Sequence, residues 1–277
     1  MTGGPDITRH YTVGSLLEKL DAALADDGAD PARPGMDALA PYDQFHGRGI
    51  EATVDLADGL DIAPGDHVLD IGSGIGGPAR YMAERFGCRV SGIDLTAEFC
   101  DVARVLTARL GMSDRVAITN GDALAMPFAD AAFAGAYSMN VSMNIADKQA
   151  FYAEILRVLK PGGWLALSEA ARGEGAEVDY PTPWALTAES SFLASPAETE
   201  AALARAGFAD IQCRSDVEAY LAFGAKSRAL VEKGGKPPHR AVFLIHGELA
   251  PEMAANTSRA IAADAIRPLE VRCRKPG

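Results

Sequence analysis

The spacing of apolar residues changes along this chain, and each spacing predicts a different kind of element. In residues 15–27 the leucines and Ala23 return every three or four positions, which predicts an amphipathic helix. Residues 31–41 hold three prolines and a glycine, and we expect a loop there. A second helix is predicted from Ile50 to about Gly59. The N-terminal part of the chain is therefore expected to be helical.

Beyond residue 66, strand-like and helix-like patterns alternate. Short apolar stretches predict strands, and segments with a period near 3.6 predict helices. Helix-length connections between strands predict a mostly parallel sheet with helices on both faces. Helical sequence fills 217–266, and we expect 268–275 to form a short edge strand. The other predicted strands cover 67–72, 88–95, 115–122, 131–140, 164–170 and 209–216, and the predicted helices cover 78–86, 97–111, 147–163 and 195–208.

The composition narrows the class of partner. The chain has 277 residues, 48% of them hydrophobic, which is enough for a large buried core. A formal net charge of −12 argues against nucleic acid and against an anionic membrane surface, because both bind through Lys and Arg. The four cysteines are scattered without metal-ligand spacing, as in a reduced cytosolic protein. We find no apolar run of signal-peptide type or of about 20 residues, and expect a soluble, cytoplasmic protein.

The stretch HVLDIGSGIGGP joins a predicted strand to a helix through a glycine loop. Such a loop gathers backbone N–H groups and the positive end of the helix dipole at one spot. Gly72, Gly74 and Gly77 fit the dinucleotide fingerprint G-x-G-x-x-G, while Asp70 through Gly76 fit D-x-G-x-G-x-G. A carboxylate at Asp70 would repel a pyrophosphate but can receive an amino group. The loop alone therefore favours a cationic cofactor only modestly.

Two further acids follow the next predicted strands. Asp94 ends the second strand about 20 residues after the loop, where a carboxylate can accept both hydroxyls of a ribose. Asp122 follows the third strand in the phrase GDALAMPF, and LKPGGWLALSE leads into the fifth. In this order, the features of residues 60–216 resemble class I S-adenosylmethionine (SAM)-dependent methyltransferases that act on small molecules. That branch includes ubiquinone/menaquinone C-methyltransferase-like and sarcosine/dimethylglycine N-methyltransferase-like enzymes.

The resemblance implies a fold, a cofactor and a set of cofactor contacts. The fold is of α/β class, a seven-stranded, mostly parallel Rossmann-like sheet with helices on both faces and an antiparallel last strand. A helical lid would cover 1–59, and the methyltransferase core would cover 60–277 with a helical insertion at 217–266. SAM would be the cofactor and S-adenosylhomocysteine the product. The implied cofactor-binding residues are Asp70, Gly72, Gly74, Gly76, Asp94, Leu95, Asp122, Ala123, Met139 and Arg48.

Residues near the transferred methyl group follow no single pattern, because methyl transfer depends on alignment more than on a fixed catalytic set. The catalytic candidates are Tyr11, which resembles an N-terminal lid tyrosine, His46 in a glycine-flanked aromatic segment, and Asn140 at the end of the fourth strand. For each of them packing in the core or lid is the structural alternative. The substrate-binding candidates are Tyr42, Asn144, Glu169, Trp184, Phe192 and His246.

Several functions stay open at this point. The leading interpretation is methyl transfer to an amine nitrogen of a small cytosolic metabolite, because aromatic residues around Trp184 could bind a methylated ammonium and no deprotonating dyad is evident. C- or O-methylation of a ring is the alternative within the same class. An NAD-dependent oxidoreductase and a non-catalytic SAM-binding protein are more distant. We expect a small-molecule methyl acceptor, no nucleic acid, no membrane and no metal, and leave a homodimer open.

Overall fold

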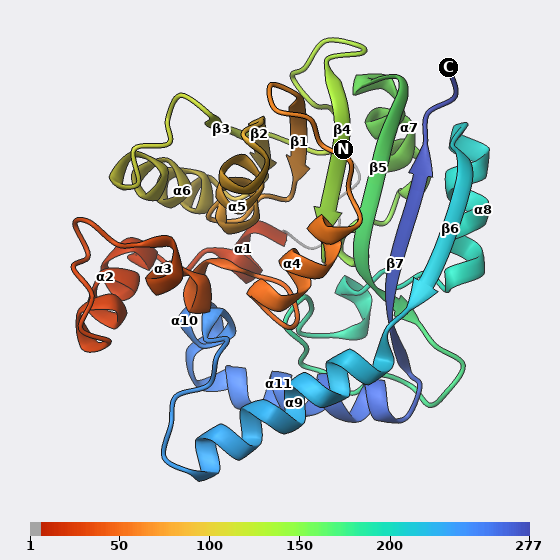
Figure 1. Cartoon of the computed structure of the whole chain (residues 1–277). Helices are drawn as coiled ribbons and strands as arrows, with labels where there is room; N and C mark the ends of the chain where they lie inside the picture. The colour runs from red at the N-terminus through yellow and green to blue at the C-terminus, as the bar shows by residue number, and fades with distance from the viewer. Residues whose placement is uncertain (1–6) are drawn as a thin grey trace.

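The protein is built on one twisted sheet, seen in a computed structural model that describes residues 7–277. Its seven strands lie in the order β3-β2-β1-β4-β5-β7-β6 (Figure 1). The pairs among β1 to β5 are parallel, whereas β7 is antiparallel to both β5 and β6. The predicted sheet and its antiparallel last strand are confirmed. The strands are β1 His67–Ile71, β2 Arg89–Asp94, β3 Val116–Asn120, β4 Phe133–Met139, β5 Leu159–Arg172, β6 Ala209–Ser215 and β7 Ile266–Arg274.

Helices cover both faces of this sheet, with α4 and α5 on one face and α7 and α8 on the other (Figure 1). Local signals set some of their ends. Ser195 and Glu198 form a capping box at the start of α8, and Gly207 ends it in a left-handed conformation. The helices are α1 Ile7–Tyr11, α2 Leu16–Asp26, α3 Met36–Asp43, α4 Ile50–Asp58, α5 Gly77–Phe86, α6 Ala97–Arg109, α7 Lys148–Val158, α8 Pro196–Ala206, α9 Val217–Glu232, α10 Ala241–His246 and α11 Ala250–Ala262.

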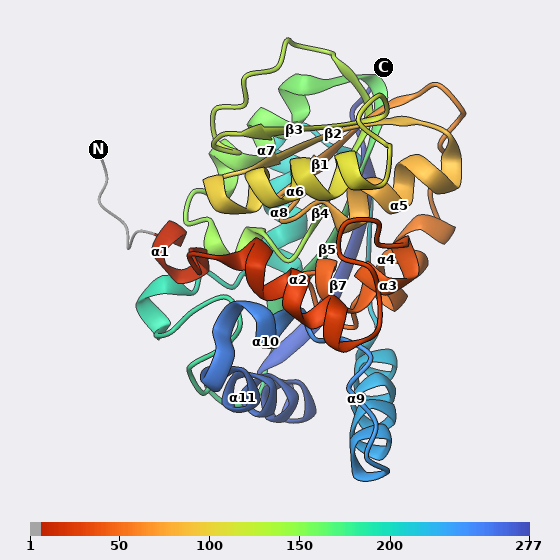
Figure 2. The ribbon, with the colours of Figure 1, turned by 90° about the vertical axis from the view of Figure 1, so that its left-hand side faces the viewer.

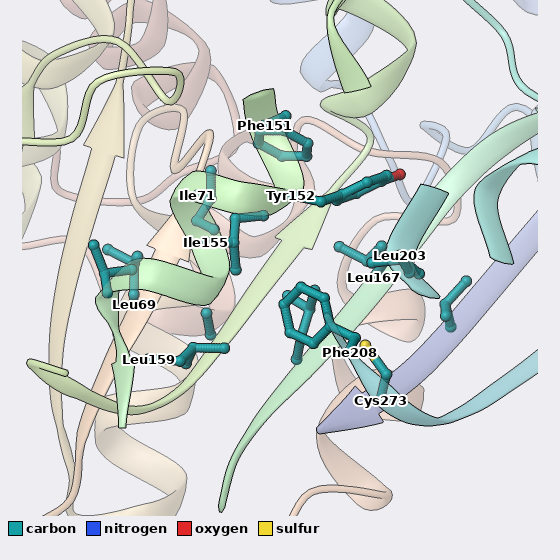
Figure 3. Close-up of a cluster of buried hydrophobic side chains, with 14 of the residues drawn as sticks. Leu69, Ile71, Phe151, Tyr152, Ile155, Leu159, Leu167, Leu203, Phe208 and Cys273 are labelled. Atoms are coloured by element: carbon teal, nitrogen blue, oxygen red, sulfur yellow. The ribbon is translucent and has the colours of Figure 1, made fainter. Parts of the chain in front are cut away.

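Alternating side chains of the central strands build two hydrophobic cores. Val68 of β1 packs into the core beneath α4 and α5, and the next residue, Leu69, packs into the core beneath α7 and α8. Figure 3 shows the second core, where Phe151 and Ile155 of α7 meet Leu203 of α8. A register shift of one residue would turn both sets of side chains to the wrong face, so burial fixes the register of the strands. The ends of β1, β4 and β5 are thereby held in place.

Three local predictions are wrong. The last strand is not an edge strand, because β7 is nine residues long and is paired on both sides by β5 and β6. Helix α7 ends at Val158, because Pro161 lacks an N–H and disfavours helix in the residue before it, and this segment joins β5 instead. Helix α3 runs through Pro41, where we expected a loop. Burial of Leu39 and Tyr42 on this helix outweighs the proline.

Two helical groups lie beside the carboxyl ends of the parallel strands (Figures 1 and 2). Helices α2 and α3 pack through Leu16 and Leu39 onto Phe99 of α6 and Ile75 of the glycine loop. Helices α9, α10 and α11 form the insertion before β7, and α10 contacts both α2 and α3. The two groups therefore meet over the same end of the sheet. In the described part of the chain, no helix is long and apolar enough to cross a membrane.

Candidate functional site

The glycine loop connects the end of β1 to the start of α5. Gly72, Gly74 and Gly76 all have positive φ, a conformation that side chains with a Cβ rarely adopt. A Cβ at Gly72 would also lie 2.2 Å from Cγ2 of Val141, so the space above β4 requires glycine. The N–H of Gly72 donates to the carbonyl of Ile93 at 2.8 Å, which ties the loop to β2. The loop is thus fixed by its own backbone.

Two carboxylates face this loop. Asp94 accepts hydrogen bonds from the N–H of Gly74 at 2.9 Å and of Thr96 at 2.8 Å. Asp70 is 2% exposed, and within the described residues its Oδ2 has no hydrogen-bond partner. Burial raises the pKa of Asp70 to about 7, although Tyr137 opposes part of the rise. A buried carboxylate oxygen without a partner is rare, and here it fits a cationic amine at the end of β1.

The remaining predicted cofactor contacts lie around these acids. Leu95 follows Asp94 with its side chain 45% exposed. Asp122 is exposed, and its carboxylate accepts from the N–H of Leu124 at 2.8 Å. Ala123 packs against the core beneath α7, and Met139 is buried at the end of β4. These residues stay predicted contacts. Within the described residues, none of them has a buried side-chain oxygen without a hydrogen-bond partner, as Asp70 has.

A cavity of about 750 Å³ lies next to the glycine loop, beneath the insertion. Its wall is mostly apolar and includes Met143, Trp184 and Phe243. Phe45 lines it and also covers the loop, since a Cβ at Gly74 would lie 3.0 Å from the Phe45 ring. None of the loop glycines or their two acids lines the cavity. The structure therefore separates a loop site from a larger apolar chamber, with Phe45 between them.

Tyr11 brings the N-terminal segment onto the edge of this chamber. Its hydroxyl donates to Oδ1 of Asn144 at 3.0 Å, and Asn144 in turn donates to the carbonyl of Trp184 at 2.7 Å. Tyr11 lines the cavity, and its ring packs edge-on against Phe99. Burial, reinforced by the nearby charge of Asp94, raises the pKa of Tyr11, so its hydroxyl stays protonated. Three predicted residues are thus joined in one chain of hydrogen bonds.

Asn140 follows β4 directly and Glu169 lies near the carboxyl end of the neighbouring strand β5, and both line the cavity. Asn140 has a φ of 56°, a left-handed conformation that asparagine tolerates well. Glu169 accepts through Oε2 from the N–H groups of Val141 and Ser142 at 3.2 and 3.0 Å. Within the described residues, Oδ1 of Asn140 and Oε1 of Glu169 have no hydrogen-bond partner. Two buried acceptor oxygens without a partner among the described residues thus belong to side chains of the inner wall.

His46 and Arg48 line the chamber but already have partners. Nε2 of His46 lies 3.0 Å from Oγ1 of Thr53, and burial lowers the pKa of His46 to about 3. Burial thus favours the neutral ring, and His46 lies in the cavity wall, where its catalytic role stays a prediction. Arg48 is ion-paired with Asp55 and its guanidinium lies 5.6 Å from the centre of the Tyr220 ring. We accordingly move Arg48 from the cofactor contacts to the cavity wall.

The predicted substrate contacts Tyr42, Phe192 and His246 are not part of the hydrogen-bonded chain that includes Asn144 and Trp184. Tyr42 lies outside the cavity wall, because its hydroxyl donates to Asp27 at 2.8 Å and its ring packs among α2 and α3. Phe192 also lies outside the wall and contributes its backbone, with its N–H donating to the carbonyl of Met143. His246 does line the cavity, and its ring lies 4.9 Å from that of His10. We therefore remove Tyr42 and Phe192 from the candidate substrate contacts.

Several site residues were missed from the sequence. Lys148 at the start of α7 donates to the carbonyls of Ser142, Ile145 and Phe192 and so fixes the turn after β4. Tyr220 and the half-buried His239 come from the insertion and pack onto the segment that holds His46. The glycine at position 47 could have indicated this close packing from the sequence, because a Cβ there would lie 2.6 Å from the Tyr220 ring.

Arg80, a further buried charge near the site, lies on α5. It donates to Asp43 and to the carbonyl of Ile75, each at 2.9 Å, and so joins the end of α3 to the glycine loop. Within the described residues, no group of three or more His, Cys, Asp or Glu side chains could hold a metal ion.

Comparison with known proteins shows what this fold and sequence are similar to. A family model described as a methyltransferase domain matches residues 69–167. Over 108 residues the chain is 41% identical to 24-methylenesterol C-methyltransferase 2 of Oryza sativa subsp. japonica, a match that covers 39% of this chain and 30% of that protein. Over 127 residues it is 37% identical to phosphoethanolamine N-methyltransferase of Triticum aestivum, covering 46% of this chain and 25% of that protein.

A solved structure extends the likeness to almost the whole chain. Phosphoethanolamine N-methyltransferase 2 of Haemonchus contortus, in complex with phosphomonomethylethanolamine and S-adenosylhomocysteine, matches with a TM-score of 0.71 at 21% identity, over 96% of this chain and 61% of that one. The matches span less than a third of the two curated relatives. Residues 69–167 thus match a methyltransferase domain, and the chain shares its fold with methyltransferases that act on small molecules.

Proposed function

We propose that this protein transfers a methyl group from SAM to an amine nitrogen of a small molecule held in the apolar cavity. The observation that supports the proposal is that Asn140 and Glu169 line the inner end of that cavity, and that Oδ1 of the first and Oε1 of the second are buried without a hydrogen-bond partner in residues 7–277. Acceptor oxygens in an apolar wall suit a ligand that carries N–H donors, because an unpaired buried acceptor costs about 1–3 kcal/mol.

The residues of the glycine loop fit SAM. When bound, SAM supplies a methyl group already activated on a cationic sulfur. Asp70 would receive the amino group of the cofactor, which pairs the free Oδ2 and lowers the carboxyl pKa. Asp94, anchored by the N–H of Gly74, would accept hydrogen bonds from the ribose hydroxyls. A diphosphate in the same place would face two carboxylates, which argues against an NAD-dependent oxidoreductase.

The chain's own residues then position the acceptor and exclude water. Tyr11 and Phe45 close the space between the glycine loop and the cavity. Asn140 and Glu169 hold the amine with its lone pair toward the cofactor, and Glu169 takes the proton that the amine must lose. Burial raises the pKa of Glu169, opposed by the ammonium of Lys148, so this carboxylate is a better base than an exposed one.

One observation favours a second candidate. A carboxylate with a raised pKa could also remove the proton of a phenol or an enolisable carbon, which is what O- or C-methylation of a ring requires. The large apolar wall fits a ring as well as an amine with an apolar body. The two candidates differ in which atom of the product carries the new methyl group.

The test is incubation of the protein with methyl-labelled SAM and a fractionated metabolite extract, followed by mass spectrometry of labelled products. We expect a labelled N-methyl compound of low mass. Glu169→Gln should reduce its formation at least tenfold and remove the loss of activity at acidic pH, because that loss reflects protonation of Glu169. Glu200→Gln, an exposed residue of α8, is the matched control. Label in a ring carbon or oxygen would favour the second candidate, and no labelled small molecule would refute the proposal.

A further inference from the structure

One face of α9 lines the cavity along most of the helix. The lining residues return at helical spacing, as in Tyr220, Gly224, Ser227 and Val231. A helix rises 1.5 Å per residue, so the stretch from Tyr220 to Val231 is about 16 Å long. The cavity is therefore a channel that runs outward along α9, rather than a small chamber at the sheet.

The inner end of this channel is the site described above. Tyr220 packs against Gly47, whose neighbour His46 lines the same wall. Glu169 lines the same cavity as Tyr220 and His46. A molecule that fills the channel along α9 would thus end beside Glu169.

The opposite wall of the channel comes from α10 and α11, and α11 packs against α9. Figure 2 shows α9 on one side, and α11 on the other with α10 above it. This wall is built from small and apolar side chains, among them Ala255, Ser258 and Val242. Along α9 the charged lining residues are Arg228 and Glu232, both in the outer half. Most of the channel thus offers an apolar surface.

Along its length the channel leaves apolar side chains exposed. Leu221, Val231 and Phe243 line the cavity and are 40%, 48% and 40% exposed. Within the described residues α9 has no buried residue at all, although it has 16 residues and carries several large apolar ones. Such exposure is unfavourable unless a ligand covers it.

We propose that this channel binds the extended apolar body of the methyl acceptor, with a reacting polar end at Asn140 and Glu169 and a chain or fused-ring body along α9. The part about the reacting end rests on the proposed function. The channel continues from the acceptor site without a break, which is why a small molecule is its occupant rather than a second copy of this chain.

The test uses the full chain saturated with S-adenosylhomocysteine and the fluorescent probe N-phenyl-1-naphthylamine, displaced by hexylamine, octylamine, decylamine and dodecylamine. Each buried methylene is expected to strengthen binding about fourfold, because about 0.8 kcal/mol per methylene is gained. Gly224→Leu should weaken dodecylamine at least tenfold, since its side chain would fill the channel. A Cβ at Gly224 meets only the Arg228 guanidinium at 3.4 Å, so the helix tolerates the change. Ala222→Leu, exposed on the same helix and outside the lining, is the matched control.

The outcomes separate this inference from the proposed function, because no methyl transfer is measured. Equal amine affinities at all chain lengths, or equal effects of Gly224→Leu and Ala222→Leu, would overturn the channel. Light scattering that shows a dimer broken by Gly224→Leu would also overturn it, by making a second copy the occupant. If Gly224→Leu loses S-adenosylhomocysteine binding, Ser258→Leu on α11 repeats the test from the other wall. A protein that passes these tests but methylates nothing would refute the proposed function alone.

Discussion

The glycine loop and the cavity are neighbouring sites that are built in opposite ways. The loop site comes from residues close together in sequence, with Asp70 and the glycines on one strand-turn-helix unit and Asp94 on the next strand. The cavity draws its wall from Tyr11, from β4 and β5, and from the insertion before β7. The first site depends on backbone geometry that few sequences allow, whereas the second depends on how distant segments pack. Cofactor and acceptor specificity should therefore respond to different substitutions.

The largest expected effect is on the loop side. Asp94→Ala removes the acceptor for the ribose hydroxyls and leaves the N–H of Gly74 without its partner. The loss of about 2 kcal/mol corresponds to a roughly 30-fold weaker affinity for SAM, measured by calorimetric titration. Asp101→Ala, an exposed residue on α6, should change nothing. Unchanged affinity in Asp94→Ala would place the cofactor elsewhere.

Replacing Asp70 by Asn should stabilise the fold but weaken the binding of SAM. Its pKa in the folded protein, about 7, lies above the ordinary 3.8, so ionisation destabilises the fold progressively as the pH rises through that window. Asp70→Asn should therefore melt a few degrees higher than the native protein at pH 8, with no difference at pH 3. The same variant should bind SAM about tenfold more weakly, because it loses a charge-assisted hydrogen bond.

In the native protein, SAM affinity should fall as the pH is lowered below about 7, since a protonated Asp70 has no charge to offer an ammonium. Calorimetric titration between pH 5.5 and 8 measures this dependence, and Asp70→Asn should lack it. A melting temperature that drops in Asp70→Asn at pH 8 would contradict the account of this carboxylate.

The smallest effect is expected at the boundary between the two sites. Tyr11→Phe removes the hydrogen bond to Asn144 and should lower turnover about fivefold, with SAM affinity unchanged within twofold. Tyr81→Phe, at the surface of α5, is the control. Steady-state kinetics with the acceptor found in the labelling experiment separates the two quantities. Equal losses in turnover and affinity would assign Tyr11 to the cofactor side.

The sequence predicted the sheet and the strand-turn-helix form of the glycine loop well, because both rest on short-range rules. Strand periodicity, helix caps and the glycine spacing act within a few residues, and Asp70 and Asp94 could be placed from strand ends alone. It predicted the cavity less well, because Tyr42 and Arg48 are donors by type but their partners, Asp27 and Asp55, follow from packing. The edge-strand prediction for β7 failed for a similar reason, since strand order is a property of the whole sheet.

The central claim is that the site above β1 holds a cationic sulfonium nucleoside and not a dinucleotide. Titration of the native protein with S-adenosylhomocysteine and with NAD, side by side in one calorimeter, tests it most directly. We expect saturable binding of S-adenosylhomocysteine at one site per chain and no heat from NAD. Binding of NAD with no response to S-adenosylhomocysteine would contradict the claim.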